Sequence, residues 1–449
     1  MSLGLSDYIP LLIYLLGPIF IFLALFYKAQ VGLFFLIPLL PLTTVLSKMI
    51  QFPLGKDFVD IMIISIALGW FFQERKHLLD DTPFNKLILL LLITTAVSVY
   101  RGNVFLHEEF SFGNTRLQVF KNFAILPLLY FLTVNNIKDK KSILLLVLLM
   151  TFSMLAMGVN FRSTFIFVKR YHFTAEMRLG GMLNYLGPNE LASFFAQYTF
   201  VLLGIFFFDT SKMRRILLGL AMIFNSYVLI YTYSRAAYFS TLVTLAFICF
   251  LKDKRLLIGI GIFLVVWRAI LPVSVVERID MSFFSQTELT EDEARRHGTI
   301  SIGGTKLDTV GRTKIWKQAL DIFTGNPLFG TGYNTFIGRA GWDTHNQYLK
   351  ILAEQGLIGI TLFLVFIYLA FKTGWQLFKT ANDRFLKGLG LGFTACVIAS
   401  ALANLAGDRW TYYNLMGFFW VFLALVVRGN IITENQLAAD NHGTNDQVI

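Results

Sequence analysis

The residue best suited to proton transfer is His345, in the segment THNQYLKILAEQGLIG (344–359). Histidine is the side chain whose ordinary pKa lets it gain and lose a proton near neutral pH. His345 lies where a polar loop meets an apolar run, so it has access to both water and a membrane boundary. Two interpretations stand here: a base that activates a hydroxyl group, and an interfacial histidine whose polar tip stays in water. Asn346 and Tyr348 follow it as candidates for substrate contact or for support of the site.

Arginines form the second group of candidates, because a guanidinium is a fixed fork that binds phosphate through two hydrogen bonds. Arg235, in TYSRAAY, lies between two apolar runs joined with almost no loop. A charge at this depth favours a function, and an exposed tight turn is the alternative. Arg312 stands at the start of residues 307–325, whose spacing predicts an amphipathic helix. The apolar face of that helix is expected to contain Ile315, Trp316, Ala319, Leu320 and Phe323.

The segment RLGGMLNYLGPNELA (178–192) contributes Arg178 and Asn189. Pro188 and Asn189 precede an apolar run and predict the start of a helix, whose free N–H groups can receive an anion. Arg116 is a further candidate for binding a diphosphate, with an interfacial anchor as the alternative. Arg409 follows Asp408 in a short turn near the C-terminus, where a local ion pair between the two is the competing interpretation.

Several common sources of catalytic power have no counterpart in the sequence. It holds no glycine-rich nucleotide loop, no Asp-x-Asp pair and no cluster with zinc-ligand spacing. We therefore expect no metal and no cofactor, and expect arginines and helix N-termini to stabilise the charge that develops in the reaction.

Composition indicates an integral membrane protein. Hydrophobic residues make up 55% of the 449 residues, and only 15% are charged. The net charge of +11 is explained by membrane loops and anionic lipid, so no nucleic-acid partner is expected. We count 13 apolar spans, within a range of 12–14. They are 9–26, 31–49, 58–73, 84–100, 118–134, 142–159, 190–208, 214–233, 236–251, 255–271, 348–371, 387–405 and 413–428.

Short loops rich in lysine predict the cytoplasmic side, which places the long loop 272–345 and His345 on the outer side. The chain divides into four parts on this basis. Residues 1–160 hold the N-terminal transmembrane helices, and 161–271 the central helices with an outer loop. Residues 272–347 form the large outer loop with the catalytic motifs, and 348–449 the C-terminal helices and a cytoplasmic tail.

Three motifs in order resemble the O-antigen ligase and O-antigen polymerase superfamily: SRAAY, then GRTKIW with NPLFGTGYNTF, then THNQYLKILAEQGLIG. RLGGMLNYLGPNELA matches the pattern that precedes them in the family, so the similarity covers residues 178–359. The segment 285–305 departs from the family pattern. The resemblance implies an all-α integral membrane protein of the GT-C type in the bacterial inner membrane, with its active site on the periplasmic side.

The resemblance also implies an activity: a metal-independent glycosyltransferase that takes glycan from undecaprenyl diphosphate. The acceptor would be lipid A-core or another glycan for a ligase, and a growing repeat unit for an O-antigen or exopolysaccharide polymerase. Carried over to this chain, His345 would be the base, and Arg235 and Arg312 would hold the diphosphate. Arg178 and Asn189 fall within family motifs with less defined roles. A transporter or flippase for the lipid-linked glycan is the alternative from another class, and membrane lipid is a partner in each case.

Overall fold

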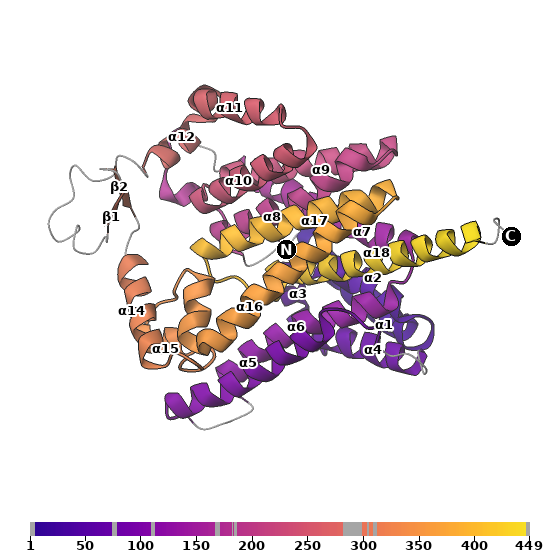
Figure 1. Ribbon diagram of the computed structural model, residues 1–449. Coiled ribbons are helices and arrows are strands. Elements are labelled where there is room, and N and C mark those ends of the chain that lie inside the picture. Colours follow the sequence, from indigo (N-terminus) through magenta and orange to yellow (C-terminus); the bar gives the residue numbers. More distant parts are fainter. Residues whose placement is uncertain are drawn as a thin grey trace.

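The computed structural model describes residues 5–73, 79–108, 113–166, 171–181, 183, 186–281, 299–302, 305–308 and 312–445. Within these ranges the protein is a helical membrane bundle, as the sequence predicts (Figure 1). The N-terminal helices are α1 (Leu5–Phe26), α2 (Ala29–Leu39), α3 (Thr43–Lys48), α4 (Phe58–Gln73), α5 (Asn85–Phe105), α6 (Thr115–Asn136) and α7 (Lys140–Phe165). The later helices are α8 (Pro188–Phe208), α9 (Lys212–Tyr231), α10 (Arg235–Lys252), α11 (Leu256–Ile270), α12 (Val273–Asp280), α14 (Arg312–Gly325), α15 (Phe336–Ala340), α16 (Gln347–Thr380), α17 (Arg384–Ala403) and α18 (Tyr413–Asn445).

Short elements complete the described chain. They are the 3-10 turns η1 (Met49–Gln51), η2 (Gly55–Asp57), η3 (Ala175–Met177) and η4 (Asn404–Ala406), and the strands β1 (Thr299–Ile302) and β2 (Thr305–Asp308). The two strands form an antiparallel hairpin in which Thr299 lies opposite Asp308. Most of the segment 285–305, including His297, lies outside the described residues.

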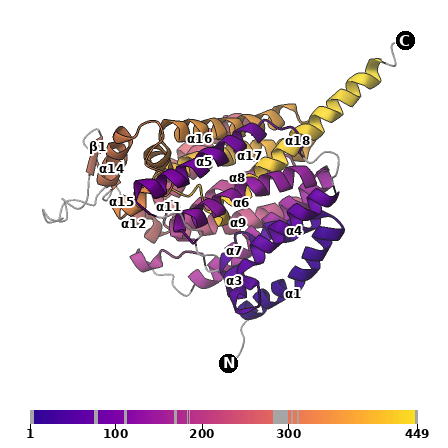
Figure 2. The same ribbon diagram turned by 90° about the horizontal axis from the view of Figure 1, so that it is seen from below.

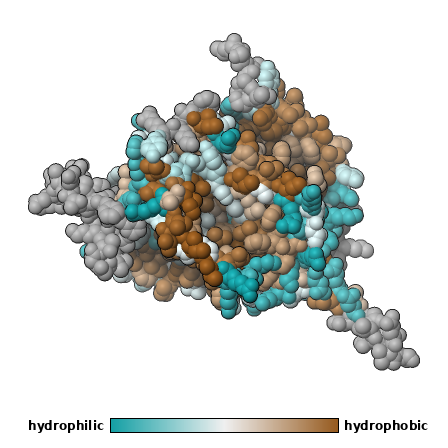
Figure 3. Space-filling view, turned by 90° about the horizontal axis from the view of Figure 1, so that it is seen from above, coloured by the Kyte–Doolittle hydropathy of each residue, from teal (hydrophilic) through white to brown (hydrophobic). Residues whose placement is uncertain are grey.

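Each of the 13 predicted spans corresponds to a helix or a bent helix pair. Ten helices in the described chain are long and apolar enough to cross a membrane, and two bent pairs raise this number to 12. The bent pairs are α2 with α3 (101°) and α11 with α12 (110°). α4 has 16 residues, too few for a single helix to be counted as a span, and accounts for the difference from 13. α11 has no buried residue, and the face of the bundle on its side carries broad apolar areas (Figure 3).

The centre of the bundle is made by α8, α17 and α18. The apolar window of α18 is 89% buried, more than that of any other candidate span. α8 and α17 approach closely through glycines: a Cβ at Gly204 would lie 2.4 Å from the Cα of Gly392. Small residues allow such backbone contact between membrane helices, where dispersion rather than the hydrophobic effect holds helices together. α18 then continues beyond the bundle toward the C-terminus (Figure 2).

Helix α16 is interrupted at one residue, and the loop that precedes α16 is hydrogen-bonded to the interrupted turn. Gly356 has φ 63 and ψ −158 inside the helix. The broken turn receives the NPLFGTGYNTF segment: Leu357 N donates to Pro327 O (2.8 Å), and Gly332 N donates to Glu354 O (2.8 Å). The Glu354 carboxylate accepts from Asn334 N (2.9 Å) and Phe336 N (3.1 Å), so it holds this loop against α16.

The amphipathic helix predicted at 307–325 is α14, and it packs on α16. Ala319 of α14 is buried together with Phe336 of α15 and Ala353 of α16, and Ile315 packs against them. Leu320 is 45% exposed, so its place on the buried face was predicted wrongly. One residue turns a helix by about 100°, and the packed positions 315, 319 and 322 leave Leu320 beside the contact rather than in it.

Candidate active site

His345 lies in a tight turn that is fixed on both sides. Its backbone adopts φ 51, in the left-handed region that non-glycine residues seldom occupy. Asn346 caps α16 by accepting hydrogen bonds from Tyr348 N (3.0 Å) and Leu349 N (3.1 Å). Thr344 O accepts from the Trp316 indole N–H of α14 at 3.1 Å. The turn is therefore held from α14 and α16, while the His345 side chain is exposed.

The same turn is also joined to the segment between α17 and α18. Gln347 N donates to Gly407 O (3.0 Å), and Trp410 N donates to the Gln347 side-chain oxygen (3.3 Å). The Tyr348 hydroxyl donates to Ala401 O at 2.9 Å. Asn346 and Tyr348 thus support the site through backbone contacts, which is one of the two roles expected for them.

Lys350 connects this turn to the C-terminal segment through two carboxylates. Its ammonium group lies 2.9 Å from Asp343 Oδ1 and 3.1 Å from Asp408 Oδ2. The Asp343 and Asp408 carboxyls also hydrogen-bond to each other. The competing interpretation, a local ion pair between Asp408 and Arg409, does not describe the turn: Asp408 pairs with Lys350, and Arg409 pairs with Glu190 and donates to Ala403 O.

His345 lies within the electrostatic reach of four charged groups. Burial by surrounding atoms is the largest cause that lowers the pKa of His345, and the positive charges of Arg312 and Arg409 lower it further. Asp408 and Glu190 oppose this effect. The imidazole therefore favours its neutral form, the form that can accept a proton.

A second cationic group lies at the N-termini of α8 and α10. Arg178 Nη2 donates to the Asn189 side-chain oxygen at 2.8 Å, and the Arg178 Nε has no hydrogen-bond partner. Burial and then the neighbouring charge of Arg235 lower the pKa of Arg178. Arg235 is the first residue of α10, directly after Tyr233 with its left-handed backbone and Ser234. The free N–H groups of both helix N-termini add positive potential to that of the two guanidiniums.

Glu190 joins the two groups. It is the third residue of α8, and its carboxylate lies 3.4 Å from Arg409 Nε. The negative charge of Glu190 acts on the pKa of both His345 and Arg178. Four segments distant in sequence therefore meet at one end of the bundle: the loop before α8, the start of α10, the loop carrying His345, and the turn before α18.

Arg116 occupies a different position. Its guanidinium forms two hydrogen bonds of 2.8 Å with the Glu108 carboxylate and a third with Asn103. It lies against Gly102, close to the 331–335 loop. None of the described contacts connects Arg116 to His345 or to Arg178.

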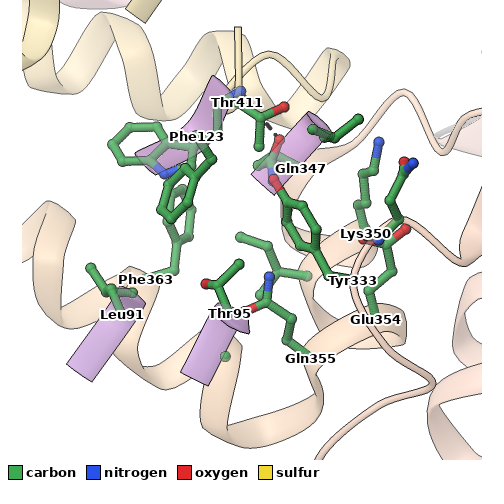
Figure 4. A pocket seen from close by; sticks show the side chains of 15 residues that line it. Leu91, Thr95, Phe123, Tyr333, Gln347, Lys350, Glu354, Gln355, Phe363 and Thr411 are labelled. Atoms are coloured by element: carbon green, nitrogen blue, oxygen red, sulfur yellow. Dashed lines mark hydrogen bonds between the residues drawn. The ribbon is translucent and has the colours of Figure 1, made fainter. Parts of the chain in front are cut away.

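A small cavity of about 40 Å³ lies behind the His345 turn, between α5, α6 and α16 (Figure 4). Its polar wall includes Gln347, Lys350, Gln355 and the Tyr333 hydroxyl, and the Tyr333 hydroxyl has no hydrogen-bond partner by geometry. A volume of this size holds about three water molecules at roughly 10–15 Å³ each. It is too small for a sugar.

The chain is similar to known proteins in the segment that contains Arg235, Arg312 and His345. Residues 220–364 match the family model described as O-antigen ligase. The predicted resemblance is confirmed. The ligase-family segment, 220–364, runs from α9 through the first half of α16. The chain is also 28% identical over 139 residues to the exopolysaccharide production protein ExoQ of Rhizobium meliloti (strain 1021). That alignment covers 27% of this chain and 31% of the relative, so the chain matches about a third of that relative's length.

Sequence reasoning selected the arginines and His345 but missed Glu190, Asp343 and Lys350. Glu190 follows Pro188 and Asn189, at the third position of a predicted helix where an acidic residue is favoured by the helix dipole. This signal predicts a helix start and gives no hint of the partners. Asp343 is two residues before His345, and nothing in its spacing indicates that it shares a lysine with Asp408. The ligase-family segment contains neither Glu190 nor Asp408.

Proposed function

We propose that the protein is a glycosyltransferase that moves glycan from an undecaprenyl-diphosphate carrier to a hydroxyl group of an acceptor. The acceptor we favour is lipid A-core, as in O-antigen ligases, and the site would face the periplasm from the bacterial inner membrane. The observation that carries this proposal is that His345 lies within the electrostatic reach of Arg312 and Arg409. Glu190, which lies 3.4 Å from Arg409, in turn acts on Arg178, the neighbour of Arg235. The match of residues 220–364 to the O-antigen ligase family supports it.

In the proposed reaction, His345 and the arginines have separate roles. The acceptor oxygen attacks the anomeric carbon, and its proton passes to the neutral imidazole of His345. The bond from the anomeric carbon to the diphosphate breaks, and the leaving diphosphate keeps the electron pair. Arg235, Arg312 and Arg178 bind this anion, and they stabilise it more strongly as the negative charge increases. No metal ion is required, because guanidiniums and helix N-termini supply the positive charge.

The test is glycan transfer by purified protein in vesicles that contain a lipid-linked donor and lipid A-core. His345→Ala is expected to lower the rate by a hundredfold or more, on the order of the loss of a general base. His172→Ala is the matched control, because His172 is exposed and pairs with Glu277 outside the site. Transfer at the wild-type rate by folded His345→Ala protein would remove the proposed base.

A repeat-unit polymerase is the second candidate, and the similarity to a protein named for exopolysaccharide production favours it. The two activities differ in the acceptor alone. Incubation with lipid-linked repeat units and no lipid A-core separates them: longer chains on the carrier identify a polymerase, and no reaction until lipid A-core is added identifies a ligase.

A further inference from the structure

Glu190 is the one carboxylate of the described site that is not neutralised by the Lys350 cluster. Arg178, Arg235, Arg312 and Arg409 bring positive charge to this end of the bundle, and Asp343 and Asp408 are bound to Lys350. Of these guanidiniums, that of Arg409 has a described contact with the Glu190 carboxylate. Glu190 lies 3.4 Å from Arg409 and acts electrostatically on Arg178 and His345. A negative charge among arginines reduces their mutual repulsion and also weakens their attraction for an anionic ligand.

The position of this carboxylate is fixed by its own helix. A Cβ at Gly187 would lie 2.5 Å from Glu190 Oε2, so the carboxylate folds back over the glycine at the N-cap of α8. The helix dipole favours a negative charge there. Glu190 therefore occupies the kind of helix N-terminus at which an anionic phosphate would otherwise bind. Its side chain is 29% exposed, so it is accessible from the site.

We propose that Glu190 competes with the diphosphate for these arginines and thereby hastens release of the diphosphate product. This inference rests on the proposed function. The leaving diphosphate carries more charge after transfer than before it, so the arginines that assist bond cleavage also retain the product. An internal carboxylate beside them lowers the affinity for the product and returns the site to its empty state. Glu190 is thus a positioning residue for the arginines rather than a proton acceptor.

Binding of undecaprenyl diphosphate to full-length protein in nanodiscs tests the proposal directly. Glu190→Gln keeps the size and polarity of the side chain and removes its charge. We expect it to bind undecaprenyl diphosphate about tenfold more tightly, because the substitution removes a negative charge beside the arginines. We also expect a lower steady-state turnover with an unchanged single-turnover rate, because release becomes slower. Glu434→Gln removes the same charge from α18, where Glu434 accepts a hydrogen bond from Gln376, and it should change neither value.

The outcomes separate this inference from the proposed function. Unchanged or weaker binding of undecaprenyl diphosphate by Glu190→Gln overturns the inference while wild-type binding stands. No wild-type binding above that of an uncharged polyprenol overturns the proposed function and the inference together. If Glu190→Gln does not fold, Glu190→Asp withdraws the carboxylate from Arg409 and keeps the charge. It is expected to bind the diphosphate more tightly than wild type, and equal affinity there overturns the inference.

Discussion

At the scale of single residues, the protonation state of His345 follows from its neighbours. Burial, Arg312 and Arg409 lower the pKa of His345, and the imidazole is neutral over a wider pH range than a free histidine. A depressed pKa means that the base form is lost only as the pH falls through a value below the ordinary pKa of about 6.5. We therefore expect the acid limb of kcat/KM for glycan transfer to lie below pH 6.5.

The contribution of Arg312 to this limb can be measured separately. Arg312→Gln removes one of the charges that lower the pKa of His345, so the acid limb should move to higher pH. The overall rate should also fall on the order of a hundredfold, as for loss of an electrostatic donor. Profiles of kcat/KM for the donor against pH, recorded for both proteins, measure these effects. A limb at the same pH in both would contradict the electrostatic link between Arg312 and His345.

The shifted pKa values of Asp343 and Asp408 indicate that the stability of the protein, rather than its catalysis, depends on their protonation. Burial and the hydrogen bond that protonated Asp343 donates to Asp408 raise the pKa of Asp343 to about 7. Burial opposes ionisation of Asp408 too, but Asp343 and Lys350 lower its pKa to about 2. Between about pH 4, where a free aspartate titrates, and pH 7, the folded protein holds a proton on Asp343 that the unfolded chain has lost. Stability therefore falls as the pH rises through this window.

Asp343→Asn tests this dependence. The variant has no carboxyl to ionise at this position, so its melting temperature in detergent should lose the decline between about pH 4 and 7. Asp253→Asn changes an exposed aspartate on the loop between α10 and α11 and should keep the wild-type slope. Equal slopes in the wild type and Asp343→Asn would show that the Asp343 proton is absent.

At the scale of elements, the break in α16 determines where the loop before His345 is attached. Gly356 combines a left-handed φ of 63° with close contact, since a Cβ there would lie 2.5 Å from Leu328 O. Gly356→Ala adds backbone strain of about 1–3 kcal/mol, because φ 63 with ψ −158 is a conformation open almost only to glycine, and it adds a clash with the loop. We expect the free energy of unfolding to fall by about 2–4 kcal/mol. Thermal denaturation in detergent measures this change.

Gly341→Ala is the matched control for this prediction. Gly341 also has a left-handed φ, of 73°, but a Cβ there meets no atom within 4 Å. It therefore reports the strain of a left-handed backbone without a clash, about 1–2 kcal/mol. Equal effects of the two substitutions would show that contact between α16 and the NPLFGTGYNTF loop contributes nothing.

At the scale of the whole molecule, the sequence predicts individual helices better than the contacts between them. The start of α8 at Pro188, the helix α14 and the thirteen apolar segments follow from local patterns of residues. The meeting of Arg178 with Arg235, and of Asp343 with Asp408, depends on how helices from distant parts of the chain pack. The pairing of Arg409 with Glu190 likewise arises from a tertiary contact, which periodicity does not encode.

The packing of α8 on α17 links the bundle to the site, because α8 carries Asn189 and Glu190 and α17 leads to Asp408 and Arg409. A Cβ at Gly392 would lie 2.6 Å from Val201 O, so Gly392→Ala forces the two helices apart.

Overpacking of this kind costs about 1–3 kcal/mol, and the same shift separates Arg409 from Glu190. We expect Gly392→Ala to lower both the melting temperature in detergent and the rate of glycan transfer. Gly259→Ala on α11, where a Cβ meets nothing within 4 Å, should preserve both. A Gly392→Ala protein with the wild-type melting temperature and rate would show that close contact of α8 and α17 does not set the geometry of the site.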